Sequence, residues 1–230
     1  MNPELSVIEF KNKDVLSKSL SDKVSYLLDK TISLSKDPWL VVPGGSTPVD
    51  FFDNLSSRNI DWNRVHITLT DERWVKTDSS ISNEALVRNS LLKNKACTAK
   101  FHGLKTNHGT ISEGFYSIKK RLEIFEKPDV LIVGMGLDGH TASMFPNDPN
   151  LAEYFSLVNT EIFSRVKNKD SEYERITLNY NYLSSARNII LLIHGLDKME
   201  VLNKAMEENN PMKYPISVFF NNNLEVYWSR

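Results

Sequence analysis

The sequence predicts an α/β fold with a mostly parallel, Rossmann-like sheet, helices on both faces and a C-terminal hairpin strand. Five short apolar runs, rich in β-branched residues, have polar, Gly or Pro residues on either side, which is typical of strands covered on both faces. Stretches with helical spacing of apolar residues lie between these runs, and that alternation indicates a parallel α/β sheet. The predicted strands are residues 39–42, 65–69, 130–133, 189–193 and 216–220.

The remaining elements follow from periodicity and turn residues. Apolar side chains recur every three or four residues over 15–28 and over 115–125, which predicts two amphipathic helices. Residues 148–174 are polar and irregular and are expected to be an insertion between two strands. Three asparagines at 221–223 favour a turn, so residues 224–228 are expected to form an antiparallel hairpin strand. No repeat and no linker divides the chain, and we expect residues 1–230 to form a single domain.

The composition excludes several classes of protein. Among 230 residues, 28 Lys and Arg against 29 Asp and Glu leave a net charge of -1, which argues against a nucleic-acid or membrane-surface protein. The lone Cys97 can form no internal disulfide. The first ten residues lack a signal-peptide pattern, and no apolar run approaches the roughly 18 residues of a membrane span. We therefore expect a cytoplasmic, monomeric enzyme or binding protein with a small-molecule partner.

The first predicted strand ends in a glycine-rich turn. Gly44 and Gly45 allow the backbone to turn sharply and approach a ligand, and Ser46 or Thr47 followed by Pro48 suits a helix start. Amide and hydroxyl groups at such a start would bind an anion, phosphate above all. A capped turn without a ligand is the equal alternative at this point. The turn is not a Walker A loop, because no Gly-Lys-Ser/Thr follows.

Charged residues follow the second predicted strand. Asp71, Glu72 and Arg73 would lie at the carboxyl edge of the sheet, where α/β proteins bind their ligands. Two carboxylates and a guanidinium could serve acid/base chemistry and substrate anchoring. An exposed, self-neutralising charge cluster is the alternative.

The third predicted strand ends in a second glycine-rich loop. Residues 134–139 match the G-x-G-x-x-G pattern, but the loop follows the third strand and prolines soon stop any helix, so we reject dinucleotide binding. The loop would place His140 at a helix start, where the helix dipole disfavours its cationic form and leaves it able to accept a proton. A histidine merely bonded into the loop is the alternative. Asp138 and His140 could begin a metal site, but no third ligand has suitable spacing.

Two further cations lie at element boundaries. Arg175 precedes residues 176–178, and Lys198 follows the fourth predicted strand. Each alone would be a solvated surface charge, whereas together with Arg73 and a hydroxyl-lined loop they would suit a dianionic phosphate. Cys97 has no partner pattern for nucleophilic chemistry, and the other histidines are expected to be structural.

Taken in order, five motifs resemble those of the 6-phosphogluconolactonase family, over about residues 38–220. They are GGSTP at 44–48, TDERWV at 70–75, SNE at 82–84, GMGLDGHTASMFP at 134–146 and RITL at 175–178. The resemblance implies hydrolysis of 6-phospho-D-glucono-1,5-lactone to 6-phosphogluconate, the second step of the oxidative pentose phosphate pathway, with no cofactor and no metal. It also implies that the phosphate lies near Ser46, Thr47, Arg175 and Lys198, and that the lactone lies near Asp71, Arg73 and His140. Further contacts are expected from Gly44, Gly45, Gly136, Asp138 and Gly139.

The reaction suits these residues. An enzyme acting on a lactone must hold the ester, activate water and stabilise a tetrahedral oxyanion. We expect His140 to be the general base that later returns its proton to the ring oxygen. Arg73 or amides of the 134–139 loop would stabilise the oxyanion, and Asp71 would orient either His140 or a sugar hydroxyl.

Two other functions remain as alternatives. Glucosamine-6-phosphate deaminase shares the GSTP turn and an Asp-Gly-His segment, but it carries further carboxylates after its histidine, and residues 141–146 contain none. A non-catalytic sugar-phosphate sensor would normally carry a helix-turn-helix, for which the 37 or so residues before the first strand leave no room. One departure from the family pattern is Asn221, near which the family usually has an aspartate.

Overall fold

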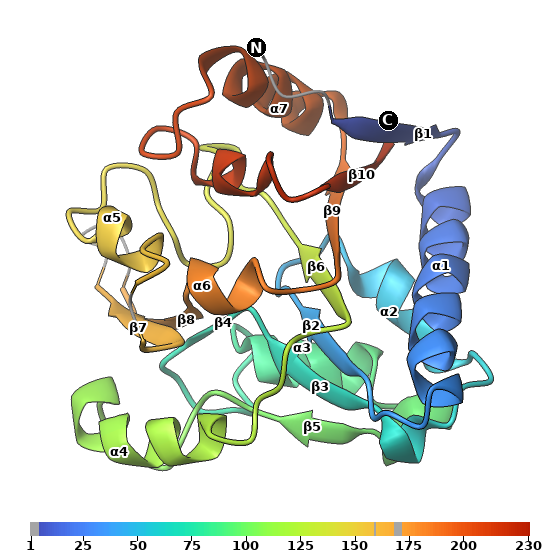
Figure 1. Ribbon diagram of the computed structural model, residues 1–230, viewed down its shortest axis with the longest axis horizontal. Coiled ribbons are helices and arrows are strands. Elements are labelled where there is room, and N and C mark those ends of the chain that lie inside the picture. The colour runs from blue at the N-terminus through green and yellow to red at the C-terminus, as the bar shows by residue number, and fades with distance from the viewer. Residues whose placement is uncertain (1–4, 159, 168–171) are drawn as a thin grey trace.

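A seven-stranded parallel sheet forms the centre of the computed structural model, which describes residues 5–158, 160–167 and 172–230 (Figure 1). Every neighbouring pair in this sheet is parallel, which confirms the predicted fold class. The strand order is β1 (Ser6–Phe10), β10 (Glu225–Ser229), β9 (Asn188–His194), β6 (Val130–Val133), β2 (Trp39–Val42), β3 (His66–Leu69) and β5 (Lys100–His102).

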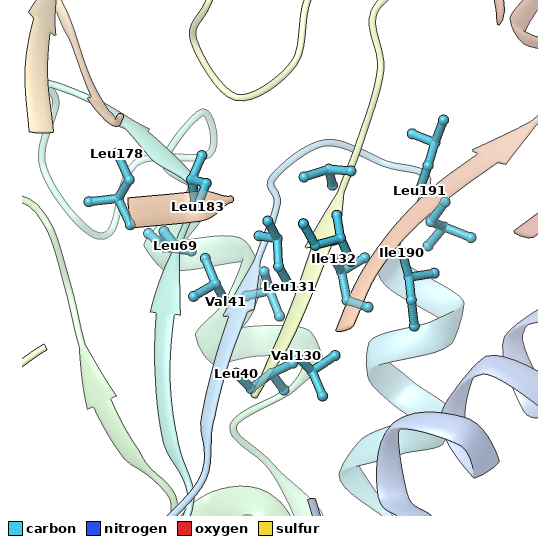
Figure 2. Packing of buried hydrophobic residues seen from close by; sticks show 14 of the residues in the cluster. Leu40, Val41, Leu69, Val130, Leu131, Ile132, Leu178, Leu183, Ile190 and Leu191 are labelled. Atoms are coloured by element: carbon cyan, nitrogen blue, oxygen red, sulfur yellow. The ribbon is translucent and has the colours of Figure 1, made fainter. Parts of the chain in front are cut away.

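Helices cover both faces of the sheet because its central strands are apolar on both sides. All four residues of β2 and of β6 are buried, and Figure 2 shows their side chains packed with those of β9. In Figure 1, α1 and α2 lie on one side of the sheet and α6 on the other. The helices are α1 (Lys13–Ser33), α2 (Val49–Ser56), α3 (Asn83–Ser90), α4 (Ile111–Leu122), α5 (Leu151–Tyr154), α6 (Tyr180–Leu183) and α7 (Leu196–Glu208), with 3-10 turns η1 (Trp62–Arg64), η2 (Asn94–Thr98) and η3 (Pro215–Phe219).

The predicted amphipathic helices are present as α1 and α4, and both have side-chain caps. The Asn12 side chain accepts a hydrogen bond from the amide of Val15 at the start of α1. Thr110 and Glu113 form a reciprocal capping box at the start of α4. Within the described residues, no helix has the length and apolar character needed to cross a membrane.

The carboxyl end of the chain differs from the prediction. Residues 216–220 are not a strand: most of them belong to η3, whose first residue is Pro215, and proline favours the start of a helical turn. Strand β10 exists, but it lies parallel to β9 and β1 and is not part of an antiparallel hairpin. The connection from β9 to β10 passes through α7 and η3, and such a crossover returns the chain in the same direction. Most of the apolar residues of η3 are buried, as those of a central strand would be. A short apolar run in the sequence therefore does not distinguish a buried 3-10 turn from a buried strand.

A second, antiparallel sheet lies at the carboxyl edge of the first. It contains β4 (Asp71–Arg73), β8 (Arg175–Leu178) and β7 (Phe163–Val166), with β8 in the middle. Strand β4 begins two residues after β3 ends, and the amide of Leu178 donates to the carbonyl of the intervening Thr70. The predicted insertion thus contributes β7, and β8 begins directly after it.

The strand order reverses direction at β2. The chain leaves β2 for β3 and β5 on one side, and it returns to β6 on the other side before continuing to β9 and β10. The loops after β2 and β6 therefore leave neighbouring strands in opposite directions and open a crevice between them, the usual ligand site of open α/β sheets. This topology brings the two glycine-rich loops together.

Toward one edge of the sheet, two histidines on β3 and β5 form a close pair. The Nδ1 atom of His66 lies 3.0 Å from Nε2 of His102, and the indole of Trp39 packs against both rings. Burial lowers the pKa of His102 from 6.5 to about 4, with help from the charges of His66 and Lys100.

This lowered pKa predicts a stability loss in mild acid. Between pH 6.5 and about 4 the unfolded chain protonates residue 102 while the folded protein does not, so the free energy of unfolding falls as the pH falls through that range. We expect His102→Gln to make the free energy of unfolding depend less on pH there. Urea titrations across this range would measure the slope, with the exposed His194 replaced by Gln as the control. An unchanged slope in His102→Gln would contradict the prediction.

Candidate active site

A cavity of about 300 Å³ opens at the reversal point, at the carboxyl ends of the central strands. Its walls come from the loops after β2 and β6, from β4 and β8, and from the first turn of α7. Ten of the residues predicted for the site line it: Gly44, Gly45, Ser46, Thr47, Asp71, Arg73, Gly136, His140, Arg175 and Lys198. The other two do not line it: Asp138 is exposed and bonds to His140, and Gly139 is buried.

The turn after β2 presents two hydroxyl groups to the cavity. Gly45 has a φ of +86°, a left-handed conformation that suits glycine. The predicted cap is wrong, because α2 begins only at Val49 and Pro48 occupies the cap position without a side-chain bond. The hydroxyls of Ser46 and Thr47 consequently make no hydrogen bond to the described residues and face the cavity at the amino end of α2. This is a favourable arrangement for an anion.

Three cations surround the same cavity. Arg73 on β4 lies directly opposite Arg175 on β8, so the two side chains project from the same face of the small sheet. Burial, and then the charge of Arg73, lower the pKa of Arg175, while the nearby Asp71 opposes the shift. The Nζ atom of Lys198 donates to the carbonyl of Met135 over 2.6 Å. Like charges opposite one another are unfavourable, so this arrangement calls for a bound anion.

Asp71 is held by hydroxyl groups and not by the histidine. The residue is 5% exposed, and its carboxylate accepts bonds from Thr70 Oγ1 over 2.9 Å and from Ser143 Oγ over 2.5 Å. Arg175 Nη1 lies 4.0 Å from the same carboxylate. Of the two roles predicted for Asp71, orientation of His140 therefore has no support in the structure. The carboxylate instead links β4 to the segment after the second glycine-rich loop.

Asp138 is the carboxylate that orients His140. Its Oδ1 atom lies 2.6 Å from His140 Nδ1 and also accepts the amide of His140. A carboxylate can only accept, so Nδ1 carries the proton and Nε2 keeps a lone pair that is free to accept one. Burial alone would raise the pKa of Asp138, but its hydrogen bond and charge interaction with His140 outweigh burial and lower that pKa.

The loop after β6 shapes this pair through its glycines. A Cβ atom on Gly136 would lie 2.1 Å from His140 Nδ1, so only glycine leaves room for the imidazole. Gly139 has a φ of +81° and packs against Tyr214. No helix begins at His140, contrary to the prediction, since the next helix starts at Leu151. The orientation of the imidazole therefore depends on Asp138 and not on a helix start.

Several amides of the same loop donate hydrogen bonds within the loop, so they are not available to stabilise an oxyanion. The amides of Gly136 and Gly139 donate to carbonyls within the loop, and that of His140 donates to Asp138. Arg73, the other predicted donor, is left as the stronger candidate.

The roles of two residues that support the site, Asn83 and Glu72, were not predicted from the sequence. Asn83 lines the cavity, yet only its presence in the SNE motif drew attention to it. Glu72 is fully buried and accepts four hydrogen bonds, so it is a structural carboxylate and not part of an exposed charge cluster.

Within the described residues, no three His, Cys, Asp or Glu side chains are grouped so that they could hold a metal ion.

Replacement of Asp138 should alter the imidazole tautomer. In Asp138→Asn the acceptor-only partner of Nδ1 is lost, and we expect His140 to shift from the Nδ1-protonated form to a mixture of tautomers. Imidazole ¹⁵N chemical shifts measure this directly, and the exposed Asp78, changed to Asn, serves as the control. Identical shifts in Asp138→Asn and the unmodified protein would refute the assignment.

Comparisons with known proteins agree with this geometry. Residues 11–228 match the family model described as glucosamine-6-phosphate isomerases/6-phosphogluconolactonase. A protein named 6-phosphogluconolactonase from Pseudomonas putida is 32% identical over 97% of this chain and 93% of its own length. Another of that name from Rhizobium meliloti (strain 1021) is 34% identical over 96% of this chain and 97% of its own length.

A solved structure supports the same relationship. The crystal structure of a 6-phosphogluconolactonase from Shewanella baltica OS155 superimposes with a TM-score of 0.95 at 35% identity, covering all of both chains. The fold, the two glycine-rich loops and these matches over nearly the full length have one explanation: this chain belongs to the glucosamine-6-phosphate isomerase/6-phosphogluconolactonase family.

Proposed function

We propose that this protein is a hydrolase that converts 6-phospho-D-glucono-1,5-lactone to 6-phospho-D-gluconate in the oxidative pentose phosphate pathway. The observation that carries the proposal is one cavity in which three cations and two free hydroxyls accompany a histidine whose Nε2 can accept a proton. The full-length relatives named 6-phosphogluconolactonase support the same assignment. The substrate is a small molecule, and residues 1–230 act as one domain.

The phosphate would occupy the end of the cavity near the β2 turn. The hydroxyls of Ser46 and Thr47, the amino end of α2, Arg175 and Lys198 would supply hydrogen bonds and positive charge to its oxygens. Binding a dianion there offsets the repulsion between the cations. It also anchors the sugar ring, so that the lactone carbonyl is held beside the histidine.

The chemical step follows from the His140–Asp138 pair. Nε2 of His140 takes a proton from water, and the resulting oxygen nucleophile attacks the lactone carbonyl carbon. Arg73 stabilises the oxyanion of the tetrahedral intermediate. When the bond between the carbonyl carbon and the ring oxygen breaks, the imidazolium returns its proton to that oxygen, and the product is an open-chain acid. Asp138 stays ionised and stabilises the imidazolium.

The two alternatives are weaker. A glucosamine-6-phosphate deaminase needs carboxylates after the histidine for ring opening, and among the described residues that line the cavity Asp71 is the one acidic side chain. A sugar-phosphate sensor would have no use for a histidine held by a carboxylate in one tautomer.

The histidine provides the first test of the proposal. The unmodified protein should hydrolyse the lactone well above the spontaneous rate, and His140→Ala should lower kcat by about 10²- to 10⁴-fold because the general base is lost. Formation of 6-phosphogluconate, coupled to its dehydrogenase, measures the rate. Equal background rates for both proteins would exclude the lactonase. Ammonia release from glucosamine 6-phosphate would support the deaminase instead.

The cations provide a second test. Arg175→Ala and Lys198→Ala remove charged hydrogen-bond donors to the phosphate, and each should raise KM roughly 10- to 100-fold with a smaller change in kcat. Lys204→Ala, on the same helix as Lys198 but exposed, is the matched control. An unchanged KM in both phosphate-site variants would contradict this division of roles.

A further inference from the structure

The Arg73 side chain is held in place at one end. Its Nη1 atom donates to Asn83 Oδ1 over 2.8 Å and to the carbonyl of Ile81 over 2.9 Å. Two acceptors on one nitrogen fix the plane of the guanidinium, because all of its N–H groups are coplanar. No described residue accepts from its Nη2 atom, although Arg73 lines the cavity. The fixed end thus determines where the unpaired donors point.

Asn83 is itself rigidly placed. The residue is 2% exposed, and its Nδ2 atom donates to the carbonyl of Asp71 over 2.8 Å, which directs Oδ1 toward Arg73. Oδ1 also lies against the β2 turn, because a Cβ atom on Gly44 would be only 1.9 Å away from it. Asn83 therefore fills the space between the anion-binding turn and the arginine.

A buried carboxylate holds the backbone of Asn83. Glu72 is 0% exposed and accepts the amides of Arg73, Asn83 and Glu84 and the hydroxyl of Ser82. These bonds join β4 to the amino end of α3. They depend on the backbone of Asn83 and not on its side chain, so the side chain can be removed without breaking the anchor.

We propose that Asn83 is a positioning residue that aims the Arg73 guanidinium at the reacting carbonyl of the substrate. The inference rests on the lactonase function proposed above. An arginine has many rotamers, and an oxyanion donor is effective only when it is held in place before the reaction. Asn83 supplies that restraint without adding a negative charge, which would weaken the attraction of Arg73 for the oxyanion.

A double-mutant cycle tests this inference on the full-length protein. Arg73→Ala should lower kcat by roughly 10²- to 10³-fold, as loss of an oxyanion donor does elsewhere. Asn83→Ala should lower kcat about tenfold with little change in KM, because the displaced arginine is only partly effective. The variant with both changes should be no slower than Arg73→Ala, because Asn83 has nothing left to position. Asn89→Ala, an exposed asparagine of the same helix, should match the unmodified enzyme.

The possible outcomes are distinct. A purely structural asparagine would lower the thermal midpoint, and its effect on kcat would multiply with that of Arg73→Ala. That result, or kcat within twofold of the unmodified enzyme in Asn83→Ala, would overturn the inference while lactonase activity remained. Absence of lactonase activity in the unmodified protein would overturn the proposed function, and the inference with it.

Discussion

Two arginines that face one another across β4 and β8 are the constraint on which the site depends. Arg73 and Arg175 repel each other in a partly buried place, and the pKa of Arg175 is lowered by that burial and by Arg73. Asp71 beside them offsets part of the repulsion. Glu72 opposes the lowering of the Arg175 pKa as well. A bound anion would offset more of the repulsion, so the cavity suits a substrate with a doubly charged phosphate and a reaction that creates an oxyanion.

Two glycines make room for the two polar pairs to which we assign the chemistry. Gly136 leaves space for His140 beside Asp138, and Gly44 leaves space for the side chain of Asn83 beside Arg73. In both places an added Cβ atom would lie where a functional side chain must be. His140, the proposed base, and Arg73, the proposed oxyanion donor, are consequently held before substrate arrives, which is the condition for electrostatic catalysis.

Three carboxylates near the site differ in role because their surroundings differ. Glu72 is buried beneath four donors and joins β4 to α3. Asp71 receives two hydroxyl groups and lies near Arg175. Asp138 pairs with His140 and has a lowered pKa. Asp71 and Glu72 are neighbours in sequence, yet they point to opposite sides of a strand, so no motif alone could assign them.

The parallel α/β class, the two glycine-rich loops and ten of the residues that line the cavity could be predicted from the amino-acid sequence. These follow from local rules, because apolar runs bury themselves and polar residues after strands gather at one edge of a sheet. Three features became clear only in the folded protein: Asp138 and not Asp71 orients His140, Asn83 holds Arg73, and β10 is parallel. Each depends on which distant segments become neighbours, and that is set by the packing of the whole sheet.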